Sequence, residues 1–217
     1  MSSRNTVILA LIIIAAGVLL SLAVYPRLPE QVASHWNAAD QVDGTMPRFW
    51  GAFIMPIISL VMLGLFLLIP VIDPLKANIA QFRRTFNLFI VLILAFMLYL
   101  HFLTTLWNLG VQSFRMSTAM LPAMGLLFIF VGVMLRQAKR NFSIGIRTPW
   151  TLSSDRVWDK THRLGAVLFV VSGIVAALGA FLPGPMSYWL VIGPVLVSTF
   201  VVLVYSYFLW RGEQTGR

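Results

Sequence analysis

Six long apolar segments constrain this chain more than any other feature of its sequence. Each is close to the roughly 20 residues that a helix needs to cross a bilayer, and none contains Asp, Glu, Lys or Arg. In lipid the backbone must bond within each segment, which favours helices over strands. The segments are residues 6–25, 49–72, 85–107, 116–135, 164–182 and 188–210. We therefore predict an all-α fold, a polytopic membrane bundle of six transmembrane helices.

The composition excludes several other classes of protein. Hydrophobic residues make up 59% of the 217 residues and charged residues 11%, and cysteine is absent. Such a chain is too apolar for a disordered protein and cannot form a disulfide scaffold. A cleaved signal peptide is the alternative for the first segment, with a possible site at Ser21-Leu22-Ala23. Its apolar core, residues 7–24, exceeds the usual 7–15 residues, so we expect a retained helix.

The basic residues predict the orientation in the membrane. The chain has 16 Lys and Arg against 7 Asp and Glu, a formal charge of +9. If both termini are cytoplasmic, the outer segments hold three of these cations, Arg27, Arg48 and Arg115, and the inner segments hold the rest. Cytoplasmic loops are enriched in Lys and Arg, so we predict both termini inside. The excess charge then points to the anionic lipids of the inner leaflet as partners and requires no nucleic acid.

Two connections are long enough to carry function, an outer loop at residues 26–48 and a basic inner loop at residues 136–163. They suggest an N-terminal membrane module (1–72), a central helix pair (73–135) and a C-terminal module (136–217). The other connections read as short turns, one of them at Pro183-Gly184-Pro185. Each half of the chain has a long loop and then a short one, so an inverted repeat is an open alternative.

The inner loop divides into a turn-rich part and a helix. Gly145 and Pro149 interrupt any helix in its first part. Ser153 or Ser154 can cap a new helix, and Asp155 is favourable in its first turn. We expect this helix to continue directly into the fifth apolar segment.

Two stripes run along this predicted helix. The basic stripe consists of Arg156, Lys160 and Arg163, and the aromatic–histidine stripe consists of Trp158, His162 and Gly165. Asp159 and Arg163 have the spacing of a helical ion pair. The simplest interpretation is anchoring to lipid head groups, and the alternative is a docking surface for a ligand or protein. In the second case Arg147 could hold an anion through its planar fork. The candidate residues of this loop are Asn141, Gly145, Arg147, Thr148, Trp150, Thr151, Trp158, His162 and Arg163.

Motifs in both long loops resemble a known family. The inner loop, residues 141–163, contains Gly-Ile-Arg-Thr-Pro-Trp-Thr and Val-Trp-Asp-Lys-Thr-His-Arg, and it resembles the signature of the SdpI family of bacterial membrane proteins. The outer loop resembles the domain of unknown function at the N-terminus of that family. Its matching residues are Leu28-Pro29, His35-Trp36-Asn37 and Asp43-Gly44.

The resemblance implies a function and a location. The family's namesake is an immunity protein against a secreted toxic peptide and is understood to hold a transcriptional repressor at the membrane. It implies an extracellular peptide and a cytoplasmic regulator protein as partners, and a place in the bacterial cytoplasmic membrane. The chain departs from the family at Asp40, where a glycine is usual. Because Asp tolerates left-handed backbone better than most residues, we expect the turn to survive.

The outer loop offers two interpretations. His35, Asp40 and Asp43 are possible metal ligands, but their spacing matches no strong metal motif. A structural turn with an Asp-Gly pair is the simpler interpretation, and we predict no metal. The candidate residues of this loop are His35, Trp36, Asn37, Asp43 and Gly44.

The third apolar segment carries a polar stripe of His101, Thr104, Thr105 and Asn108, with Asn87 near the same face. Polar groups are costly in lipid, so this face should point into the bundle. It can bond to neighbouring helices or line a wet path; our intramembrane candidates are His101, Thr105 and Asn108. In the fifth segment, Gly173 and Ala177 have the small-xxx-small spacing of close helix packing.

No motif in the chain points to catalysis or a cofactor, since it lacks a Cys nucleophile, a zinc-protease motif and a phosphate-binding loop. We expect a non-enzymatic immunity or signalling protein that responds to an extracellular peptide or envelope stress. The alternative is a small transporter or lipid-handling protein with a path near His101. A structural partner subunit is a third option, and the oligomeric state stays open.

Overall fold

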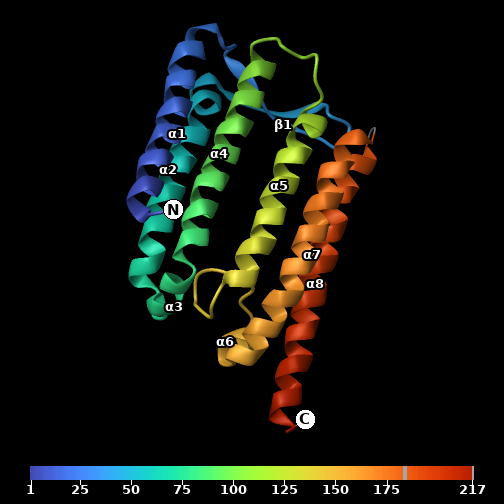
Figure 1. Ribbon diagram of the computed structural model, residues 1–217. Coiled ribbons are helices and arrows are strands. Elements are labelled where there is room, and N and C mark those ends of the chain that lie inside the picture. The colour runs from blue at the N-terminus through green and yellow to red at the C-terminus, as the bar shows by residue number, and fades with distance from the viewer. Residues whose placement is uncertain (183–184, 217) are drawn as a thin grey trace.

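Six long helices dominate the computed structural model, which describes residues 1–182 and 185–216 (Figure 1). Each of the six is long and apolar enough to cross a membrane, which confirms the predicted fold class. They are α1 (Ser3–Val24), α2 (Arg48–Ile72), α4 (Arg83–Asn108), α5 (Met116–Gln137), α7 (Asp155–Leu178) and α8 (Pro185–Gln214). Shorter helical elements lie between them: η1 (Tyr25–Arg27), α3 (Lys76–Gln81), α6 (Pro149–Ser153) and η2 (Gly179–Phe181). Part of the turn predicted at residues 183–185, Pro183 and Gly184, lies outside the described residues.

The helix between the inner loop and the fifth segment begins where its cap predicts. The Ser154 hydroxyl accepts a hydrogen bond from the Val157 amide, and Asp155 occupies the first turn. From there α7 runs without a break to Leu178, so the loop helix and the membrane span are one element. This prediction is confirmed.

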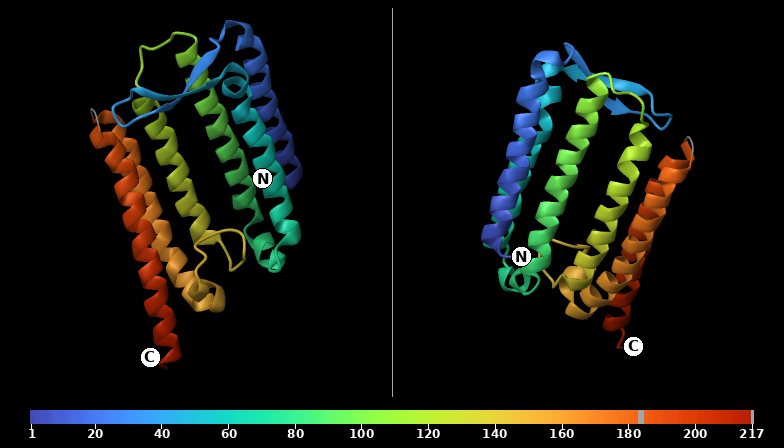
Figure 2. Two further views of the ribbon diagram at one scale, coloured as in Figure 1. Left: turned by 180° about the vertical axis from the view of Figure 1, so that it is seen from behind. Right: turned by 45° about the horizontal axis from the view of Figure 1, so that its top comes forward.

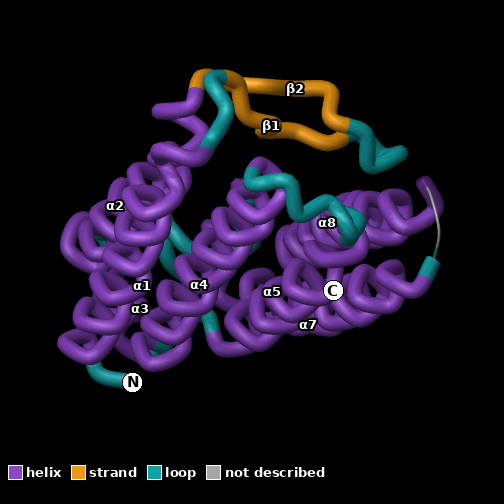
Figure 3. Tube along the Cα trace, turned by 90° about the horizontal axis from the view of Figure 1, so that it is seen from above, coloured by secondary structure: helices purple, strands orange, loops and turns teal. Residues whose placement is uncertain are grey.

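The helices pack as two groups of three (Figure 3). Helices α1, α2 and α4 contact one another, and so do α5, α7 and α8, while α4 packs against α5 between the groups. The main core lies in the first group, around Phe86, Ile90 and Leu94 of α4, and is closed at one end by Ile79 and Trp158. The division into a central helix pair and two flanking modules, and the inverted repeat, remain expectations.

Helices α5 and α7 meet along a seam of small residues. A Cβ atom on Gly125 would lie 2.5 Å from the Gly173 carbonyl oxygen and 2.8 Å from the Ala177 Cβ. Seven residues further along α5, a Cβ atom on Gly132 would lie 2.6 Å from the Ala166 carbonyl oxygen. The backbones are therefore too close for side chains at these positions, as the spacing of Gly173 and Ala177 predicts.

The outer loop forms a β-hairpin, which the sequence pattern did not predict. Strands β1 (Gln31–Trp36) and β2 (Val42–Pro47) pair antiparallel and lie across one end of the helices (Figure 2). One side chain of β1, Val32, is buried with Leu28 and Ala52. We call the end of the bundle that β1 and β2 cover the hairpin end of the molecule. The opposite end, with α3, α6 and the loop at residues 138–154, is the basic end; Met1 also lies there, bonded to Asn87 near the start of α4.

Replacing Gly125 by alanine should destabilise the bundle. The new methyl group would meet backbone atoms of α7, which cannot rotate away, so α5 and α7 must separate. Overpacking of this kind costs about 1–3 kcal/mol. Thermal unfolding in detergent would measure it, with Gly64→Ala as control, because the space around Gly64 is open. Equal unfolding midpoints for the two variants would contradict the close packing of α5 against α7.

Candidate functional site

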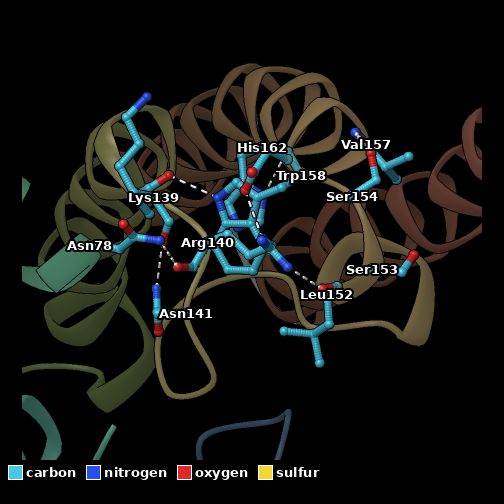
Figure 4. Close-up of polar contacts among 12 residues, drawn as sticks. Asn78, Lys139, Arg140, Asn141, Leu152, Ser153, Ser154, Val157, Trp158 and His162 are labelled. Atoms are coloured by element: carbon cyan, nitrogen blue, oxygen red, sulfur yellow. Dashed lines mark hydrogen bonds and ion pairs between the residues drawn. The ribbon is translucent and has the colours of Figure 1, made fainter. Parts of the chain in front are cut away.

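Asn141 organises the turn that follows α5 at the basic end (Figure 4). Its side chain is fully buried, and its amide nitrogen donates to the carbonyl oxygens of Lys139 and Ile144, at 2.7 and 3.0 Å. Its amide oxygen accepts from the backbone N–H groups of Ser143 and Ile144. A single side chain therefore satisfies four backbone groups, which holds the turn in one shape.

Gly145 lets this turn close over the aromatic–histidine stripe of α7. Its φ is +120°, and a Cβ atom there would lie 2.5 Å from His162 Nε2. Beneath it the rings of Trp158 and His162 stack, with centroids 3.9 Å apart. The Trp158 Nε1–H group donates to the Ala138 carbonyl oxygen at 2.9 Å. Any larger residue at position 145 would displace these rings.

The two ring nitrogens of His162 have different partners. Nε2 accepts a hydrogen bond from the Ile146 N–H group at 3.0 Å, so it carries no proton. Nδ1 lies 2.9 Å from the Trp158 carbonyl oxygen and therefore carries the ring proton. The neutral ring thus fastens the loop backbone to α7.

Thr148 and Thr151 start the short helix α6 and attach it to α8. They form a capping box in which each side chain bonds the other residue's backbone N–H group. The Thr148 hydroxyl also lies 3.3 Å from the Ser206 hydroxyl of α8. Trp150, which is half-buried, meets the Tyr207 ring edge-on at 5.2 Å between centroids.

These contacts show how the predicted inner-loop residues are used. Five of them are buried, and they hold the loop itself: Asn141, Thr148, Thr151, Trp158 and His162. Arg147 and Arg163 are exposed. The Arg147 Nη1 atom donates to the Phe142 carbonyl oxygen at 2.7 Å, which sets the direction of its guanidinium group. A partner that docks on this loop would meet the arginines, while the buried residues shape the surface beneath them.

Asp73 and Asn78 join the loop to the other helix group, and their role was not foreseen from the sequence. The buried Asp73 carboxylate accepts from the Phe142 N–H group at 3.0 Å and the Ser143 hydroxyl at 2.6 Å. The Asn78 amide donates to the Arg140 carbonyl oxygen at 2.7 Å. In the sequence Asp73 precedes Pro74, which reads as an ordinary turn. Nothing in that pattern indicates a partner 69 residues away.

The ion pairs of the basic end differ from the predicted one. Asp155 pairs with Arg140 at 2.6 Å, and Arg156 lies 3.8 Å from Glu213 of α8. The expected pair of Asp159 and Arg163 is not among the ion pairs of the described residues. Asp155 combines its favourable place at the start of α7 with a link back to the loop.

Asp40 clamps the tip of the hairpin to α5. It has the left-handed φ of 59° expected where the family has glycine. Its carboxylate accepts from the Arg115 Nε–H group at 2.9 Å and from the Ser117 N–H group at 2.8 Å, with the Ser117 hydroxyl at 2.6 Å. The carboxylate therefore caps the N-terminus of α5 from a distant part of the chain, where negative charge is favourable.

The other polar residues of the hairpin pair locally. His35 Nδ1 and Asp43 Oδ1 lie 2.5 Å apart on the exposed face. The Asn37 side-chain oxygen accepts from the N–H groups of Ala39 and Gln41 and forms the expected turn. Gly44 lies opposite His35 in the strand pairing. Since Asp40 turns towards α5, the three possible metal ligands do not converge on one point.

The polar stripe of α4 points into the bundle, as predicted. His101 is 1% exposed, and its Nε2 atom lies 2.9 Å from the Ser21 hydroxyl of α1. Ser21 in turn bonds the Ala52 carbonyl oxygen, which has no helical donor because Pro56 lacks an N–H group. Ser21, part of the possible cleavage site in the sequence, is thus a buried link between three helices.

The ends of this stripe bond to other elements. The Asn108 side chain accepts from the Ala33 N–H group at 2.7 Å and donates to the Ala33 carbonyl oxygen at 3.0 Å, as a neighbouring strand would. Thr105 is buried. The cavity beside His101 measures about 10 Å³, which is room for about one water molecule. These contacts favour interhelical bonding over a transport path.

A larger pocket lies under the hairpin, between the two helix groups. Its volume is about 270 Å³. The first group contributes Met55, Leu100 and Thr104, and the second contributes Met116, Ser117, Met120 and Tyr188. The hairpin covers it with residues that include Trp36 and the clamp residue Asp40. The Trp36 Nε1–H group is buried without a hydrogen-bond partner. The surface of the pocket is mainly apolar.

The six spans and their loops define the class of this chain, a multi-pass integral membrane protein. Residues 137–206 match the SdpI/YfhL protein family, and residues 12–60 match a domain of unknown function, DUF1648. The chain therefore carries the SdpI/YfhL family segment and its N-terminal companion, which confirms the resemblance seen in the two loops.

One curated relative is similar over almost its whole length. It is the immunity protein SdpI of Bacillus subtilis (strain 168), 26% identical over 210 residues, which cover 97% of this chain and 98% of that protein. No solved structure matches the chain. The family match at residues 137–206 includes the loop built on Asn141 and His162, and the match at residues 12–60 includes the hairpin.

Replacing His162 by alanine should loosen the basic-end loop. The Ile146 N–H group would lose its acceptor, which costs about 1–3 kcal/mol when the group is shielded from water. Hydrogen exchange of the Ile146 amide should accelerate and the unfolding midpoint should fall. Arg147→Ala, at an exposed position, is the control and should leave the midpoint nearly unchanged. An unaltered exchange rate in His162→Ala would disprove the fastening role.

Proposed function

We propose that this chain is a non-enzymatic immunity protein of the bacterial cytoplasmic membrane, with its hairpin end outside and its basic end in the cytoplasm. It protects the cell against an extracellular toxic peptide. Similarity to an immunity protein over 97% of the chain supports the immunity-type function, and the distribution of basic residues supports the orientation. The pocket under the hairpin is the observation that carries the choice of ligand.

The pocket suits an apolar side chain of a peptide. It lies at the outer end of the helices, and its lining includes three methionines, Met55, Met116 and Met120, and the rings of Trp36 and Tyr188. Methionine adapts to irregular apolar partners, which is why it is frequent on surfaces that bind peptides.

The same pocket offers a route from the outer face to the cytoplasmic loop. Its walls come from both helix groups, so an occupant would favour one spacing between the groups over others. At the basic end, Asp73 and Asn78 of the first group bond the loop that leads into the second group. A change in the spacing of the helix groups at the hairpin end would therefore strain these hydrogen bonds at the basic end.

The exposed cations of the loop are the proposed contact for a cytoplasmic regulator protein. Lys139 and Arg147 are exposed. The buried Asn141 amide bonds the Lys139 carbonyl oxygen, and the Arg147 guanidinium group bonds the Phe142 carbonyl oxygen, so both cations have a fixed place on the loop. A rigid group of cations binds an acidic protein surface with less loss of entropy than a flexible one.

Filling the pocket should abolish protection. We would express the chain in a Bacillus subtilis strain that lacks SdpI and measure survival beside cells that secrete the toxic peptide. The native chain should restore growth, and Met120→Trp, which fills the pocket, should not. Leu196→Trp, at an exposed position on α8, is the matched control and should protect. Membrane levels would be equalised by immunoblot.

Two results would contradict the proposal. Failure of the native chain to protect at a level equal to SdpI would reject immunity against this peptide. Full protection by Met120→Trp would reject the pocket as the binding site.

Removing the exposed cations should release a cytoplasmic partner. Cross-linked membranes carrying Lys139→Ala with Arg147→Ala should yield several-fold less co-purified partner than the native chain, because two charge contacts are lost. Arg84→Gln, an exposed cation on α4, is the control. Equal recovery from all three membranes would remove the loop from the signalling role.

A further inference from the structure

A groove runs along the contact between α5 and α7 on the surface that faces the membrane. Its volume is about 300 Å³, and valines line most of it. Val133, Val167 and Val171 are 39%, 56% and 50% exposed, so the groove is open to lipid. Arg136 lies at its cytoplasmic end and is the charged member of its lining.

The seam between the two helices places a second arginine beside Arg136. From Gly125 to Gly132, α5 advances seven residues, and its contacts on α7 move back seven residues, from Gly173 to Ala166. Arg136 comes one turn after Gly132, so it lies level with residues 162–163 of α7. Arg163 is on the groove side of α7, because Val167 and Val170 follow it at i+4 and i+7.

We propose that this groove is a binding site for one anionic phospholipid. One acyl chain lies along the valines, and the phosphate is held between Arg136 and Arg163. From Arg163 to Val171, the α7 side of the groove extends about 12 Å along the chain direction of a lipid. Neither arginine takes part in an ion pair among the described residues. Both guanidinium groups therefore remain available to bind phosphate through paired N–H groups.

The seam explains why the groove exists at this place. Small residues bring the backbones of α5 and α7 together, and the side chains on either side of the contact cannot fill the space beside it. An acyl chain can cover this surface at low cost, because it is flexible and apolar. Basic pockets between helices on the cytoplasmic side of a membrane are known to bind anionic head groups.

Native mass spectrometry of the purified chain would test the site. Palmitoyl-oleoyl phosphatidylglycerol would be titrated into detergent solution, with phosphatidylcholine of the same chains as the neutral probe. The chain should retain one phosphatidylglycerol in preference to phosphatidylcholine. Arg136→Gln and Arg163→Gln should each weaken retention about fivefold, and the double variant about thirtyfold. Arg84→Gln should match the native chain.

A second variant separates the groove from the charges. Val167→Trp fills the apolar part and keeps both arginines, so it should reduce retention of both lipids while a monodisperse elution profile confirms folding. Equal retention of the two lipids by the native chain, or unchanged retention by the double arginine variant, would overturn the proposal. Displacement of the lipid by inorganic phosphate alone would also overturn it, since the site would then bind a free anion.

Discussion

The need to satisfy buried backbone polar groups shapes this molecule at both ends and in the middle. In the membrane a single unpaired carbonyl oxygen is costly, and Pro56 creates one at Ala52. The Ser21 hydroxyl bonds it, and His101 completes the link between α1, α2 and α4. At the basic end Asn141 performs the same task for four backbone groups of a loop. Polar side chains that the sequence suggests as binding-site residues therefore often stabilise the fold itself.

The sequence predicted the parts of the fold that depend on local pattern. Six uncharged apolar segments predicted six helices, and Ser154 followed by Asp155 predicted the start of α7. The hairpin was not predicted, because its strands lack a long alternation of apolar and polar residues, and its tip depends on Arg115 and Ser117 of another segment. The long-range partners of Asp73 could not be read from the chain for the same reason.

The candidate sites were identified better than their roles. Motif residues such as Trp158 and His162 do lie together, but they face the inside of the loop. The spacing on one helix places side chains on a common face and does not say what covers that face. Asp40 shows the opposite case. This departure from the family pattern keeps the left-handed backbone of the turn, and its carboxylate adds a clamp to α5.

The glycine seam also decides which parts of the molecule can move. A slip of α5 along α7 by one residue, about 1.5 Å, would drive side-chain atoms into backbone oxygens that now face glycines. The two helices therefore shift as one rigid body. Motion is left to the boundary between α4 and α5, which has no such glycine contacts among the described residues. Two hydrogen bonds cross it there, from the Tyr99 hydroxyl to the Ala119 carbonyl oxygen and from the Thr85 hydroxyl to the Gln137 side-chain oxygen. That boundary is the natural hinge of the bundle.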